Sequence, residues 1–89
     1  MKLLCEFKRD SAQNILIGCA PRNVGQDHDY LTVQTHAKRI EHAVNEFSEV
    51  FGKLFPSVKI LRWEIIRRLS RKENIGAVLV TVEKIGGAA

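Results

Sequence analysis

The 89-residue chain has few cysteines and no long apolar run, and each of these absences removes a class of protein. Its two cysteines are too few for the disulfide framework of a small secreted domain. They are also too few for a structural zinc site, which takes four ligands in close pairs. No segment approaches the roughly 18 apolar residues of a membrane-spanning helix. Charged residues follow directly after Met1–Cys5, so we expect no secretory leader, no membrane partner and a cytoplasmic location.

The bulk composition is that of a folded globular domain. Apolar residues make up 45% of the chain and charged residues 27%, which argues against disorder. The length suits one domain and is too short for two. The sequence therefore predicts a single domain over residues 1–85, followed by a flexible tail over residues 86–89, Gly-Gly-Ala-Ala.

The first twenty residues have the pattern of a β-hairpin. Apolar and polar residues alternate over residues 1–9 and again over residues 14–20, and the turn-like segment Asp-Ser-Ala-Gln separates the two runs. A loop centred near Ala12 brings Cys5 opposite Cys19 and Phe7 opposite Ile17 on the apolar face. The sequence therefore predicts two antiparallel strands whose cysteines are buried.

A long apolar stripe follows and predicts a helix over residues 31–54. The spacing alternates between four and three residues, which is the repeat of an amphipathic helix. Pro56 ends the pattern. The stripe comprises Val33, Ala37, Ile40, Val44, Phe47, Phe51 and Leu54.

The rest of the chain predicts two further strands. Residues 57–72 fit a strand better than a helix, because alternation is joined by β-branched residues and Trp63, which we expect to be a core residue. Residues 71–74 would be a hairpin loop, and residues 76–85 form a second strand. The predicted fold class is α+β: a two-layer sandwich of a four-stranded, mostly antiparallel sheet with one long amphipathic helix on one face. The order along the chain is strand, strand, helix, strand, strand.

Positive charge is concentrated in one arm of the predicted hairpin. The net charge of the chain is +4, whereas residues 59–72 alone carry +5. Such a segment can bind phosphates or an acidic partner, or it can be a solvated strand face whose charges discourage edge-to-edge aggregation. The residues of this basic arm are Lys59, Arg62, Arg67, Arg68, Arg71 and Lys72.

A second apolar face predicts self-association. One helix covers one face of a sheet, so apolar residues on the opposite face would be exposed unless another molecule covers them. Strict alternation assigns Leu4, Leu16, Ile60, Ile66 and Leu79 to that face. We therefore expect a small non-catalytic interaction module that binds a second copy of itself. The alternative is a domain that binds RNA or DNA through the basic arm.

The sequence contains no convincing catalytic or metal-binding set. His28 lies between Asp27 and Asp29, but adjacent loop residues seldom converge on one ion, so we expect them to be solvated. His36 and His42 are six residues apart and do not share a helix face as residues four apart would. Cys5 lies among apolar neighbours, which favours a buried, inert thiol over a nucleophile. We expect no enzyme, no metal and no cofactor.

Overall fold

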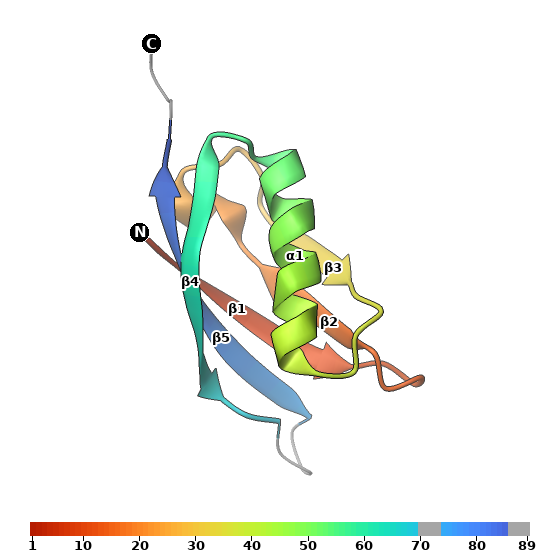
Figure 1. Ribbon diagram of the computed structural model, residues 1–89. Coiled ribbons are helices and arrows are strands. Elements are labelled where there is room, and N and C mark those ends of the chain that lie inside the picture. The colour runs from red at the N-terminus through yellow and green to blue at the C-terminus, as the bar shows by residue number, and fades with distance from the viewer. Residues whose placement is uncertain (70–73, 86–89) are drawn as a thin grey trace.

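The computed structural model describes residues 1–69 and 74–85 and shows an antiparallel sheet with one α-helix packed on it (Figure 1). The strands lie in the order β3-β2-β1-β5-β4, and each neighbouring pair is antiparallel. The predicted α+β class is confirmed, but the sheet has five strands rather than four. The elements are β1 (Lys2–Arg9), β2 (Ile15–Cys19), the 3-10 helix η1 (Pro21–Val24), β3 (Leu31–Gln34), α1 (Ile40–Leu54), β4 (Val58–Arg67) and β5 (Ile75–Lys84).

The predicted β1–β2 hairpin is confirmed, with Phe7 paired to Ile17 as expected. Its turn is held by Asp10, whose Oδ1 accepts the N–H groups of Ala12 (2.8 Å) and Asn14 (2.9 Å). Such a local side-chain bond to the backbone replaces the ladder bonds that a turn cannot make.

The predicted start of the helix is wrong: α1 begins at Ile40, and Leu31–Gln34 is the edge strand β3. In this segment Val33 and Ala37 are buried because alternate residues of an extended chain face the core. Thr35, between them, is buried as well. Its Oγ1 donates a hydrogen bond to the Ile15 carbonyl at 2.6 Å, which satisfies the buried hydroxyl. A spacing of four residues fits both a helix and a strand. The spacing of Val33 and Ala37 was therefore also compatible with a helix.

Strand β4 confirms the strand interpretation of residues 57–72 over its bounds of Val58–Arg67, but its alternation is broken twice. The register with β5 shifts between Ile60 and Arg62 and between Ile65 and Arg67. A β-bulge of this kind adds one residue to one strand. The residues after it then lie on the opposite sheet face from the one that unbroken alternation gives them. The expected hairpin loop 71–74 and the tail 86–89 lie outside the described residues, apart from Asn74.

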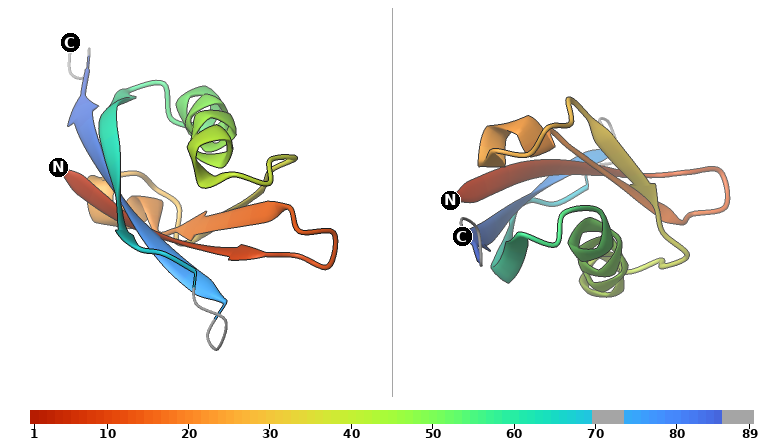
Figure 2. Two further views of the ribbon diagram at one scale, coloured as in Figure 1. Left: turned by 60° about the horizontal axis from the view of Figure 1, so that its bottom comes forward. Right: turned by 90° about the horizontal axis from the view of Figure 1, so that it is seen from above.

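The core lies between α1 and one face of the sheet (Figure 2). α1 buries the side of the helix that carries two phenylalanines, and it packs against β2 and β4. Trp63 is half-buried and packs against this core, as expected. In the described part of the chain, no helix has the length and apolarity to cross a membrane. The fully buried side chains include Leu3, Cys5, Ile15, Ile17, Val24, Val44, Phe47, Phe51, Val78, Val80 and Val82.

Candidate interaction surface

The face of the sheet turned away from α1, which we call the open face, carries apolar side chains at its centre. Leu4 of the central strand β1 pairs with Leu79 of β5, and Leu4 is 55% exposed. At the end of the ladder between β1 and β5, Lys8 pairs with Leu16 on β2 and with Ile75 on β5. The apolar residues of β1, β2 and β5 on this face are Leu4, Leu16, Ile75, Ala77 and Leu79.

The structure brings three of the five predicted self-association residues to the open face. Leu4, Leu16 and Leu79 lie there as expected. Ile60 does not, because it pairs with buried Val82 and packs against the core. Ile66 lies at the second bulge of the edge strand β4, where it has no paired residue on β5 and is 53% exposed. The assumption of unbroken alternation along β4 caused both differences.

The open face has a hollow that the sequence pattern does not predict. Its volume is about 360 Å³, and Tyr30 forms one wall. The phenol of Tyr30 lies over Gly18, at the point where any larger residue would place its Cβ atom. A glycine inside a strand often marks such a close approach, so Gly18 was the available signal. The other walls come from Glu6, Phe7, Lys8, Leu16, Thr32 and Ile75.

The charges on the open face are mixed in sign. Lys59 pairs with Glu83, and Arg62 and Glu64 follow each other along the same face of β4. Strand β1 adds Lys2, Glu6 and Lys8, which pair with uncharged residues of β5. Neighbouring charges of opposite sign reduce the long-range field that a purely basic surface would have.

The basic arm does not form one patch. Lys59, Arg62 and Arg67 pair with residues of β5 that lie on the open face. Arg68 instead lines a small hollow with Arg9 and Ile40 at the edge of the core. Arg71 and Lys72 lie outside the described residues.

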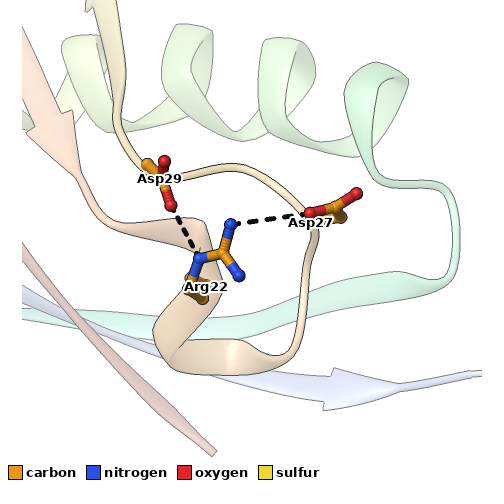
Figure 3. A network of polar contacts seen from close by, with 3 residues as sticks. All are labelled: Arg22, Asp27 and Asp29. Atoms are coloured by element: carbon orange, nitrogen blue, oxygen red, sulfur yellow. Dashed lines mark hydrogen bonds and ion pairs between the residues drawn. The ribbon is translucent and has the colours of Figure 1, made fainter.

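The loop before β3 uses its acidic residues to hold an arginine (Figure 3). Arg22 Nε donates to Asp29 Oδ1 at 2.7 Å, and its Nη2 lies 3.6 Å from Asp27 Oδ1. The ring of His28 contacts Phe55 edge-on, with 5.9 Å between ring centroids. The two carboxylates therefore face a guanidinium group. Among the described residues, no group of three or more histidines, cysteines and acidic residues is arranged to hold a metal ion.

Cys5 is buried, as its sequence context predicted. A hydrogen bond with the Cys19 thiol raises the pKa of the Cys5 thiol, and burial raises it further. A thiol in this state is a poor nucleophile toward an external substrate, because the thiolate is the reactive form.

Comparisons with protein-family models, with curated proteins and with solved structures give no match to this chain.

Proposed function

We propose that the protein is a non-catalytic interaction module whose open face binds the open face of a second copy. The observation that carries this proposal is the pairing of half-exposed Leu4 with Leu79 at the centre of a sheet face that points away from α1. Exposed apolar clusters rimmed by polar residues are typical of protein interaction sites.

The size of the open face suits a dimer interface. Strands lie about 4.8 Å apart and rise about 3.3 Å per residue, so the four strands β2, β1, β5 and β4, taken at the 8-residue length of β1, span roughly 500 Å². A standard interface buries about 800 Å² on each partner, counted as accessible surface. Because protruding side chains make the accessible surface larger than the flat area, two open faces packed at the usual separation of stacked sheets, about 10 Å, approach that value.

The arrangement of charges on β1 is compatible with a second copy as the partner. In a two-fold dimer whose axis runs along the strands between β1 and β5, each β1 residue faces the residue that it already pairs with on β5, but in the other copy. Leu4 then meets Leu79 twice. The charged residues of β1 meet uncharged ones, because Lys2, Glu6 and Lys8 pair with Thr81, Ala77 and Ile75.

The same axis places β4 of one copy over β2 of the other. Arg67 and Gly18 occupy the same row of the sheet, since Glu6 pairs with Gly18, and Ala77 pairs with both Glu6 and Arg67. Arg67 of one copy therefore comes over the hollow of the other, beside the Glu6 carboxylate and the Tyr30 ring. Carboxylates and aromatic faces are both favourable surroundings for a guanidinium group.

Light scattering after size-exclusion chromatography tests this proposal. We expect the protein to be a dimer at tens of micromolar and Leu4→Lys to weaken the dimer by roughly 30- to 1000-fold, the effect of about 2–4 kcal/mol at an interface centre. The matched control is Leu54→Lys, because Leu54 is equally exposed (52%) but lies on α1. A monomeric wild type, or equal weakening by both variants, would overturn the proposal.

Nucleic-acid binding is the second candidate function, favoured by one observation. Lys2 and Arg62 both pair with Thr81, from opposite sides, so two cations flank one residue on the open face. If this surface binds RNA or DNA, affinity will fall steeply with salt, and combined Lys2→Ala and Arg62→Ala substitutions will flatten that dependence. Fluorescence anisotropy with a labelled oligonucleotide measures both quantities. Absence of binding at low salt removes this candidate.

A further inference from the structure

The two cysteines of the chain face each other across β1 and β2 inside the core. The register of these strands runs to the pair Glu6–Gly18, and the next pair in the same register is Cys5 with Cys19. Both side chains are on the core face, with 0% and 3% exposure, and both thiols are free.

The direction of the backbone hydrogen bonds of β2 shows which kind of cross-strand pair Cys5 and Cys19 form. In an antiparallel ladder, opposed residues alternate between pairs that exchange backbone hydrogen bonds and closer pairs that do not. Ile15 directs its backbone groups away from β1: its N–H donates to Ala37 O (2.9 Å) and its C=O accepts from Thr35 N (3.0 Å). Alternate residues share this direction, so Cys19 also directs its backbone groups away from β1.

The backbone hydrogen bonds of β1 show independently that Cys5 and Cys19 do not exchange backbone hydrogen bonds. Met1 and Val82 exchange two hydrogen bonds, of 2.8 and 2.9 Å. Alternate residues of β1, including Cys5, therefore direct their backbone groups toward β5. Cys5 and Cys19 thus form a non-hydrogen-bonded pair, for which the Cα atoms lie about 4.5 Å apart. That separation is at the short end of the range that a disulfide bridges, about 4.4–6.8 Å.

We propose that Cys5 and Cys19 are an oxidation site, which forms a reversible disulfide between β1 and β2 with hydrogen peroxide as the oxidant. The Cys19 thiolate attacks one peroxide oxygen, the O–O bond breaks, and Cys19 becomes a sulfenic acid while hydroxide leaves. The Cys5 thiol then attacks the Cys19 sulfur, its proton passes to the departing oxygen, and water leaves. Two thiols lose two electrons, and one peroxide becomes two waters.

The surroundings of the pair assign the first step to Cys19. A hydrogen bond from Cys5 lowers the pKa of the Cys19 thiol, whereas the same contact and burial raise the pKa of Cys5. Cys19 also ends β2, so it is the thiol that a small opening at the strand end would expose first. Peroxide is small enough to enter through such an opening.

Formation of the bond will stabilise the domain. The disulfide closes a loop of about 15 residues in the unfolded chain, which reduces the entropy gained on unfolding. Allowing for strain in a cross-strand disulfide, we expect the midpoint of thermal unfolding to rise by roughly 5–15 °C. A thiol reductant should return it to the starting value.

Intact-mass measurement of the peroxide-treated protein tests the proposal. After denaturation and treatment with iodoacetamide, the oxidised protein should be lighter than the reduced chain by two hydrogens and should carry no alkyl group. Proteolysis should yield one cross-linked peptide pair containing both cysteines. Reduction before alkylation should restore two alkylated cysteines.

The Cys5→Ala and Cys19→Ala variants are the matched controls, and neither should show the loss of two hydrogens. The wild-type result decides the proposal even if a variant folds poorly. Three results would overturn it. The first is a folded protein that keeps two alkylatable cysteines at a peroxide dose that fully oxidises the urea-unfolded chain. The others are sulfinic acids in place of a disulfide, and a disulfide between two chains.

Discussion

Replacing Phe47 with alanine should lower the free energy of unfolding by about 3–5 kcal/mol, the usual cost of removing a buried aromatic ring. Phe47 is fully buried on α1, and its ring centroid lies 5.6 Å from that of Phe51. Phe51 in turn contacts Phe55 edge-on at 4.8 Å, so the cavity opens beside a chain of three aromatic rings. Urea denaturation followed by circular dichroism measures this change. Because a domain of this size has a stability of about 5–10 kcal/mol, the variant should be close to unfolding at elevated temperature.

The matched control for Phe47→Ala is Leu54→Ala. Both residues belong to the stripe that the sequence assigned to one helix face, yet Leu54 is 52% exposed at the end of α1. Its substitution should cost less than about 1 kcal/mol, since little apolar area returns to water. Equal effects of the two substitutions would contradict the described packing of α1.

The sequence predicts elements well where one periodicity extends over the whole element. The β1–β2 hairpin follows from strict alternation and a short polar turn, so even the pairing of Phe7 with Ile17 was predictable. The C-terminal half of the helical stripe predicts α1 because its two intervals of three residues, from Val44 to Phe47 and from Phe51 to Leu54, cannot occur on one face of a strand. Val33 and Ala37 do not discriminate, because their spacing of four fits both periods. The missing information was the pairing partner, β2, that makes residues 31–34 a strand.

The composition of the open face was only partly predictable, for a different physical reason. A bulge depends on how two strands accommodate twist and packing, and nothing in the residues around Leu61 and Ile66 marks an extra position. The predicted faces of β4 therefore hold between the two bulges but are wrong for Ile60, which precedes the first bulge, and for Ile66, which lies at the second. By contrast, β1 and β5 are unbroken, and their contributions, Leu4 and Leu79, were assigned to the correct face. The position of Tyr30 was not predictable from alternation, because Tyr30 lies one residue outside β3 and reaches the open face only over Gly18.

Replacing Gly76 with alanine should lower the free energy of unfolding by about 2–3 kcal/mol, although it adds only a methyl group. Gly76 of β5 pairs with Phe7 of β1, next to the last row of the ladder between these two central strands. A Cβ atom at this position would collide with the edge of the Phe7 ring and would lie 2.8 Å from the backbone oxygen of Arg67. The ring can rotate only within a packed core, and the carbonyl belongs to the neighbouring strand. Overpacking of this kind typically costs about 1–3 kcal/mol, and the backbone contact places the expected value in the upper part of that range.

The same substitution at Gly52 is the control, and it should have the opposite sign. Gly52 is exposed on α1, and the position that its Cβ would take is open space, with no side chain or other element packed within 4 Å. Alanine there should stabilise the protein by about 0.5–1 kcal/mol, because glycine is a poor helix former. Phe7→Leu combined with Gly76→Ala tests the cause: if the ring collision dominates, the double variant will be less destabilised than the sum of the single variants by more than about 0.5 kcal/mol. Additive effects would instead assign the cost to the Arg67 carbonyl, and a neutral Gly76→Ala would contradict the close packing of Phe7 over β5.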